Sequence, residues 1–144
     1  MREISIKGLP IIGKGANGTI YRLDEDKIVK VYNPNTNTLD RIEQEKYVAK
    51  KMLVYDIPSA ISYDIVKVDD KYGLVYEWIN ASTLGQYLSN NPDQLDEFAI
   101  RMAKLLIKLH STKFEKEILP DGRENLHMWV NIAEQSGYYS DEVI

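Results

Sequence analysis

The sequence predicts an α+β fold, in which a five-stranded antiparallel sheet with one helix precedes a segment made only of helices. Apolar and polar residues alternate over much of the stretches 19–32 and 61–78, which is the period of half-buried strands. Over 39–53 and 95–109 the apolar residues instead recur every three or four positions, as in amphipathic helices. Because only helical periods follow Asn80–Ser82, we expect two parts, residues 1–80 and residues 81–144.

Composition limits the classes of function. The 144 residues suit one core or two small lobes, and the net charge of −4 argues against a strongly basic nucleic-acid-binding protein. The absence of cysteine excludes disulfides and cysteine-based zinc sites, and the two histidines, His110 and His127, lie too far apart in sequence to suggest a metal centre. No apolar run is long enough to span a bilayer, and the N-terminus lacks an apolar signal core. We therefore expect a cytoplasmic protein that binds neither nucleic acid nor membrane.

Three strands are predicted before the polar stretch Asn33–Thr38. Isoleucines at positions 4, 6, 11 and 12 mark the first strand, with an interruption at Gly8–Pro10. The segment "TIYRL" alternates and predicts the second strand, and the acidic residues Asp24–Asp26 predict a turn. The third strand covers Lys27–Tyr32, and the polar stretch after it is the most linker-like part of the chain.

A helix follows over Leu39–Leu53, with its apolar residues on one face. Either Thr38 or Asp40 is suited to cap its start. The helix must end before Pro58, because proline cannot continue it. Two strands around the turn "DDKYG" then form a hairpin that completes the predicted sheet.

The second part is predicted to be helical. Pro92 suits the first turn of a helix, with Asn91 as its cap, and the strongest amphipathic pattern of the chain runs over Leu95–Leu109. The tail Glu124–Ile144 predicts one more helix. Large exposed apolar patches mark association sites, so we expect self-association through these C-terminal helices if their apolar faces lack cover.

The stretch "GKGANGTIYRL", residues 13–23, has three glycines at the spacing G-x-G-x-x-G. A dinucleotide-binding fingerprint needs a helix after the loop, whereas "TIYRL" predicts a strand. A Walker A loop needs a hydroxyl residue after its lysine, whereas Gly15 follows Lys14. A tight bend or bulge without any ligand is a further interpretation.

A fourth interpretation is the phosphate-covering loop of kinase N-lobes, which lies between two strands and precedes a phosphate-binding lysine on the next strand. Lys30 occupies that position, twelve residues after Gly18. Such a lysine is usually held by a carboxylate on the following helix. Glu43 and Glu45 are both candidates, and we prefer Glu45.

The chain resembles kinase-like phosphotransferases, in particular bacterial small-molecule kinases of the aminoglycoside phosphotransferase and choline kinase type. The resemblance covers roughly Ile4–Ser111 and rests on six stretches that occur in the family's order: "GKGANGTIYRL", "KIVKVY", "RIEQEKYVAKKM", "DIPSAISYDIVKV", "YGLVYEWINASTL" and "FAIRMAKLLIKLHS". It implies a protein-kinase-like N-lobe over residues 1–80 and the first helices of a C-lobe over residues 81–144. One departure is "NAS", at Asn80–Ser82, where the family usually has an acidic residue or glycine.

The resemblance also implies that the chain binds ATP, with a role for each matched position. The glycines would shape the loop over the phosphates, and two residues would lie near its tip: Gly13, Gly15 and Gly18, with Asn17 and Thr19. Lys30 would contact the α- and β-phosphates, and Glu45 would orient it. The Glu77 carbonyl and the Ile79 amide, in a hinge over Tyr76–Ile79, would face adenine. Apolar surface around the base would come from Ile12, Ile20 and Val29, and Leu84–Leu88 would start the helix after the hinge.

The residues that perform phosphoryl transfer in this family have no counterpart in the sequence. The family uses an H-[GN]-D-x-x-x-x-N loop and a later aspartate to position the acceptor and bind Mg²⁺, whereas "STKF" follows His110 and "MWVN" follows His127. We therefore expect the ATP-binding part of a phosphotransferase that acts on a hydroxyl of a small metabolite or aminoglycoside, without turnover by this chain alone. A fragment, a truncated gene product and a chain completed by a partner all remain open. The alternative is a pseudokinase-like interaction module without nucleotide.

Overall fold

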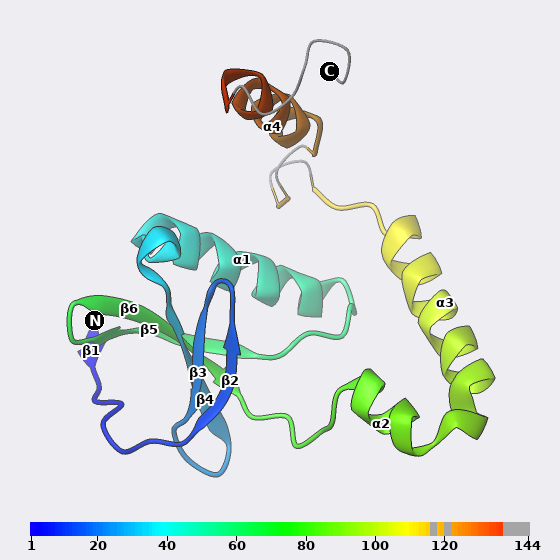
Figure 1. Cartoon of the computed structure of the whole chain (residues 1–144), viewed down its shortest axis with the longest axis horizontal. Coiled ribbons are helices and arrows are strands. Elements are labelled where there is room, and N and C mark those ends of the chain that lie inside the picture. The colour runs from blue at the N-terminus through cyan, green and yellow to red at the C-terminus, as the bar shows by residue number, and fades with distance from the viewer. Residues whose placement is uncertain (116–117, 120–121, 137–144) are drawn as a thin grey trace. The chain divides into compact units, whose positions relative to one another are not determined.

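The computed structural model describes residues 1–115, 118–119 and 122–136 (Figure 1). The chain divides into two compact units, Met1–Lys113 and Phe114–Ile144. The division expected near residue 80 would separate the sheet from two helices inside the first unit, and it stays a prediction. In the second unit, helix α4 covers Gly122–Ser136, so a helix is present in the tail where one was predicted, and the last part of that tail lies outside the described residues.

A six-stranded sheet forms the centre of the first unit. The strands lie in the order β1-β5-β6-β4-β3-β2, and every pair of neighbours is antiparallel except β1 and β5. Their bounds are β1 Arg2–Glu3, β2 Ile11–Gly15, β3 Gly18–Arg22, β4 Lys27–Tyr32, β5 Ser62–Val68 and β6 Lys71–Glu77.

The prediction of five antiparallel strands is wrong by one strand. The predicted first strand is two strands, because β1 pairs parallel with β5 at the opposite edge of the sheet from β2. Between them Gly8 has a φ of 80°, a left-handed conformation that glycine adopts without steric cost and that breaks a strand. Ile4 and Ile6 lie between the two strands and pack against a cluster of buried valines in the sheet.

The helices follow the predicted order. Their bounds are η1 Pro34–Thr36, α1 Leu39–Val54, α2 Leu84–Asn90, η2 Pro92–Gln94 and α3 Leu95–Ser111, where η marks a 3₁₀ turn. Thr38 occupies the N-cap position of α1, but its side chain makes no capping hydrogen bond. Asn91 and Pro92 begin η2 rather than α3, so α3 starts one turn later than its predicted cap.

The two faces of the sheet carry separate apolar clusters, because successive side chains of a strand point to opposite faces. On one face the buried residues are Val29, Val31, Val66, Val68 and Val75. On the other face Tyr32 and Leu74 pack against Ile42 of α1. Helix α1 therefore covers the Tyr32 face, and the alternation along β4 puts Lys30 on that face as well.

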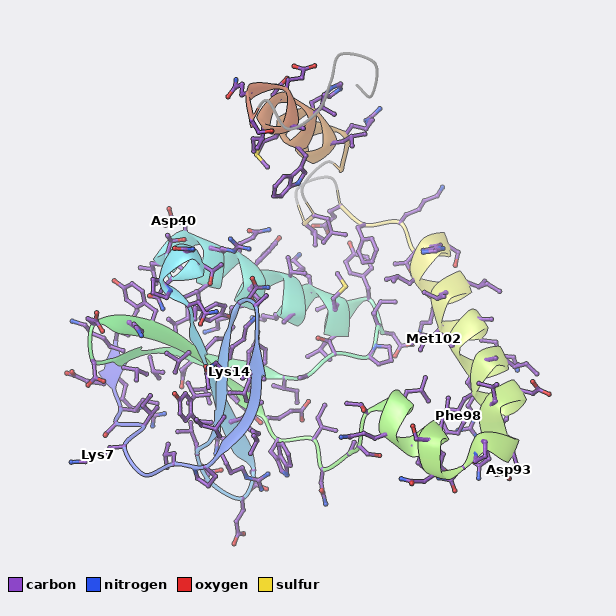
Figure 2. All side chains as sticks on the ribbon, viewed as in Figure 1. Lys7, Lys14, Asp40, Asp93, Phe98 and Met102 are labelled. Atoms are coloured by element: carbon purple, nitrogen blue, oxygen red, sulfur yellow. The ribbon has the colours of Figure 1, made fainter. Side chains whose placement is uncertain are left out.

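Helix α3 has no buried residue. Its Phe98 packs on Tyr87 of α2, with ring centroids 5.2 Å apart (Figure 2). The large apolar side chains of α3 that are exposed are Leu95, Ile100, Met102, Leu105, Leu106 and Ile107. Within the described part of the chain, no helix has both the length and the apolar character needed to cross a membrane.

Candidate functional site

The glycine-rich stretch forms the β2–β3 hairpin, with Gly15 paired to Gly18 across the turn at Ala16 and Asn17. A β-carbon added at Gly18 would lie 2.5 Å from the carbonyl oxygen of Val31, so the fold itself requires glycine there. A β-carbon added at Gly15 would meet nothing within 4 Å. Gly15 also lacks a left-handed φ, so neither a close contact with the described residues nor the backbone conformation requires glycine there.

One row of paired residues crosses the sheet on the face covered by α1. Gly13 pairs with Ile20, Ile20 with Lys30, and Lys30 with Leu74. Leu74 belongs to the apolar cluster with Ile42 of α1. The glycine loop, the lysine and the helix therefore share one face of the sheet.

Lys30 forms an ion pair with Glu45 of α1. Its Nζ lies 2.7 Å from Glu45 Oε1, and the two side chains are 23% and 35% exposed. Glu43, the other candidate, is exposed, and no ion pair of Glu43 occurs among the described residues. The structure thus brings Lys30 to Glu45 and leaves Glu43 apart.

Two tyrosines complete this pair: Tyr76, which sequence analysis placed only in the hinge, and Tyr32, to which it gave no role. The hydroxyl of Tyr76 donates to Glu45 Oε1 at 2.6 Å, the same oxygen that Lys30 reaches. Lys30 Nζ lies 4.5 Å from the ring centre of Tyr32, within the range of a cation–π contact. No sequence motif marks these tyrosines. The alternation of side chains along β4 and β6, however, places both of them on the face of the sheet that α1 covers.

Burial and hydrogen bonding act against each other on Glu45. Burial alone would raise the pKa of this carboxyl, but the hydrogen bonds from Lys30 and Tyr76, together with the charge of Lys30, outweigh burial and hold the pKa below its usual value. Burial and the neighbouring Glu45 raise the pKa of the Tyr76 hydroxyl. Glu45 is therefore ionised and Tyr76 protonated at neutral pH, which is the state that this set of hydrogen bonds needs.

Tyr76→Phe is expected to lower the free energy of unfolding by about 1 kcal/mol, because the part-buried Glu45 oxygen loses one donor. The pKa of Glu45 should rise toward its usual value in this variant. Denaturant unfolding measures the first effect, and the pH dependence of unfolding measures the second. Tyr47→Phe is the control, because Tyr47 is 41% exposed on the same helix as Glu45. Equal stability of the two variants would contradict the role of the Tyr76 hydroxyl.

The end of β6 lies where the hinge was predicted. Glu77 is its last residue, and the Glu77 side chain, rather than its backbone carbonyl, accepts the Ile61 amide at 2.8 Å. Ile79, two residues later, is 54% exposed. Between them the Trp78 amide donates to the Asp26 carbonyl at 2.7 Å, and the Arg22 guanidinium lies 4.2 Å from the Trp78 ring centre. The hinge is thereby fixed to the β3–β4 turn, a contact that sequence analysis missed.

Of three further predicted positions, Val29 lies elsewhere than expected, Thr19 faces away from Lys30, and Asn17 lies at the loop tip as expected. Val29 is fully buried in the valine cluster on the face away from Lys30, so the expectation that it surrounds the base is wrong. Ile28, two residues before Lys30, has the required parity instead. Thr19 pairs with Val31 inside β3 and shares the valine face, so its side chain does not join the set. Asn17 lies at the turn, where its carbonyl accepts two hydrogen bonds.

A hollow lies beside the valine face of the sheet. Its lining includes Thr19, Val31, Val68 and Asp70, and also Tyr32, but neither Lys30 nor Glu45. In the part of the chain that the structure describes, no group of three or more histidine, cysteine, aspartate or glutamate side chains is placed to hold a metal ion.

Comparison with known proteins identifies the family. A model described as the phosphotransferase enzyme family, of the aminoglycoside phosphotransferase type, matches residues 8–139, which is most of the chain. No curated protein matches the sequence significantly. The matched residues include the glycine loop, the Lys30–Glu45 pair and the hinge. The chain therefore belongs to the phosphotransferase enzyme family, whose members are kinase-like proteins.

Proposed function

We propose that this chain is the ATP-binding part of a small-molecule phosphotransferase. Membership of the family supports small-molecule phosphotransfer as the general chemistry. The observation that carries the proposal is the ion pair of Lys30 and Glu45, 2.7 Å apart, in register with the glycine loop on one face of the sheet. A part-buried lysine held by a carboxylate has a fixed position from which it can contact phosphate oxygens.

The proposal assigns roles to the hairpin and the hinge. Backbone approach at Gly13 and Gly15, with Gly18 closing the hairpin, would let the loop cover the phosphates. The Glu77 carbonyl and the Ile79 amide would contact the adenine edge, with Ile20 and Ile28 supplying apolar surface on the Lys30 face. Asn17 and Thr19 would contribute backbone atoms rather than side chains.

The proposal extends to binding and not to turnover. Preorganised charges usually supply the largest part of the stabilisation of a phosphoryl-transfer transition state, and the 144 residues contain no H-[GN]-D-x-x-x-x-N motif to supply them. The acceptor, a hydroxyl of a small metabolite or aminoglycoside, and Mg²⁺ would then be bound by residues that this sequence does not contain.

The competing proposal is an interaction module without nucleotide. The ion pair of Lys30 and Glu45, in register with the glycine loop, favours nucleotide binding.

Calorimetric titration with Mg-ATP tests the proposal. Wild-type chain should bind, and Lys30→Ala should bind at least about tenfold more weakly, because a hydrogen bond to a charged group contributes about 1.5–3 kcal/mol. Lys67→Ala is the matched control, because Lys67 is an exposed strand lysine that lies outside the site. Equal heats for wild type and Lys30→Ala would refute the role of Lys30, and no binding by wild type would refute the proposed function.

We further propose that the chain self-associates through its C-terminal helices. The support is the exposed apolar side of α3, which has no buried residue. Sedimentation velocity should therefore show a concentration-dependent increase in mass, and Ile107→Glu, at a position 67% exposed, should abolish it without loss of helix. A constant monomer mass at high protein concentration would contradict this.

A further inference from the structure

The polar stretch Asn33–Asn37, which the sequence suggests is a linker, is instead bonded to the sheet at both ends. We call it the asparagine clasp. It consists of Asn33, the 3₁₀ turn η1 (Pro34–Thr36) and Asn37, and it connects β4 to α1. Its side chains bond to backbone groups of residues up to 35 positions away, which a linker would not do.

One end of the clasp holds the tip of the glycine loop. The Asn33 side-chain amide donates to the Ala16 carbonyl at 2.7 Å and lies 3.5 Å from the Gly15 carbonyl. The Asn33 backbone amide donates to the Asn17 carbonyl at 3.0 Å. The Thr36 hydroxyl lies within hydrogen-bond distance of the same oxygen, at 3.0 Å, and of the Asn33 carbonyl, at 3.1 Å. The carbonyls of three consecutive loop residues are thus turned toward the clasp.

The other end of the clasp is anchored to the middle of the sheet. The Asn37 side chain donates to the carbonyls of Tyr72 at 3.0 Å and Tyr32 at 3.1 Å, and it accepts the Tyr72 amide at 2.9 Å. The Asn37 side chain thereby bonds both backbone groups of Tyr72 in β6, as a residue of a neighbouring strand would do. Because Pro34 fixes the first turn of η1, little freedom remains between the two ends.

The orientation of the loop peptides follows from this contact. In a trans peptide the N–H points opposite to the C=O, so a clasp that holds the Ala16 carbonyl turns the Asn17 amide to the other side. Free carbonyl oxygens near a phosphate would repel it, whereas amides attract it. Hydrogen bonding of the loop carbonyls to the clasp turns these oxygens away from a phosphate and leaves the backbone amides facing it.

We propose that Asn33 and Thr36 are positioning residues that set the glycine loop for the phosphates of the nucleotide. The inference deepens the proposed ATP binding and rests on it. Because the clasp acts on the loop and not on the hinge, it affects recognition of the phosphates and not of the base. Asn33→Ala and Thr36→Val should each weaken ATP binding about three- to tenfold, as expected for loss of one or two hydrogen bonds, and leave adenosine binding unchanged.

Two matched controls are available in the clasp. Asn35 is exposed, and the structure gives it no hydrogen bond to the described loop residues, so Asn35→Ala should bind ATP as wild type does. Thr36→Ser keeps the hydroxyl that Thr36→Val removes, so it should restore most of the affinity.

The test combines titration of ATP and of adenosine with amide hydrogen exchange of residues 13–19 in the absence of nucleotide. The expected result is faster exchange of the loop and weaker ATP binding in Asn33→Ala and Thr36→Val, with the strands β4 and β6 as protected as in wild type. Unchanged exchange, or equal weakening of ATP and adenosine, would overturn the inference. Wild-type ATP binding that persists unchanged in Asn33→Ala would overturn the inference alone, whereas no ATP binding by wild type would overturn the proposed function with it.

Discussion

Gly15→Ala is expected to weaken ATP binding at least about tenfold while changing the free energy of unfolding by less than about 0.5 kcal/mol, and Gly18→Ala is expected to destabilise the fold. The reason is the different surroundings of the two glycines. A β-carbon at Gly15 meets nothing in the protein, so only a bound molecule can clash with it. A β-carbon at Gly18 would lie 2.5 Å from the Val31 carbonyl and must push β3 away from β4. Overpacking of this kind costs about 1–3 kcal/mol.

Denaturant unfolding and calorimetric titration of the two variants measure these effects separately. Gly85→Ala is a control for the substitution itself, because Gly85 in α2 also has open space around a β-carbon and lies outside the loop. A Gly15→Ala variant that binds ATP as tightly as wild type would show that the loop does not approach the phosphates there. A Gly18→Ala variant of wild-type stability would show that the hairpin adjusts at little cost.

The spacing of the glycines could be found in the sequence, but the separate reason for each could not. G-x-G-x-x-G is one pattern, whereas the close pairing of β3 with β4 requires glycine at position 18, and no neighbour among the described residues requires it at position 15. Gly73 is the opposite case, a glycine that the fold requires although the sequence did not indicate the requirement. A β-carbon there would lie 2.8 Å from a methyl group of Val29, yet the sequence pattern placed Gly73 only in the turn "DDKYG" and gave no sign of this contact. Such requirements come from neighbours distant in sequence, which a local pattern does not contain.

Local periodicity predicted the elements well because most of them are amphipathic. The bounds of β4 agree with the prediction at both ends, and α1 extends one residue beyond it. The alternation of side chains along β4 could also be deduced from the sequence, since the neighbours Val29 and Lys30 must point to opposite faces of the sheet. The expectation that Val29 surrounds the base did not take this alternation into account. The parallel pairing of β1 with β5 is different, because two residues, Arg2 and Glu3, carry no periodic signal.

The asparagine clasp shows why polar stretches are hard to interpret from sequence. Asn, Thr and Pro in "NPNTNT" are typical of loops, and for that reason the stretch was the most linker-like part of the chain. Side-chain amides can replace backbone partners when a strand ends nearby, as Asn37 does for Tyr72. Whether they do so depends on a strand that lies 35 positions later in the sequence. The composition of the stretch itself does not show that this strand will be next to it.

Glu45→Gln is expected to remove a part of the stability that depends on pH and to weaken ATP binding about tenfold. The folded protein holds the pKa of Glu45 below its usual value, which is about 4.3 in an unfolded chain. In the window below about pH 4.3 the unfolded state binds more protons than the folded state, so stability rises with pH there. The contribution of Glu45 is fully present above about pH 4.3 and is lost as the pH falls through the lower folded value.

Unfolding of wild type, Glu45→Gln and Glu43→Gln from about pH 3 to about pH 7 tests this linkage. The stability difference between wild type and Glu45→Gln should be largest near neutral pH and shrink in acid, whereas Glu43→Gln, at an exposed position of the same helix, should follow wild type throughout. The affinity for ATP should fall only in Glu45→Gln, because Lys30 then loses the charge that holds it. A stability difference that does not vary with pH would mean that Glu45 acts by packing, and the ion pair would then not be what positions Lys30.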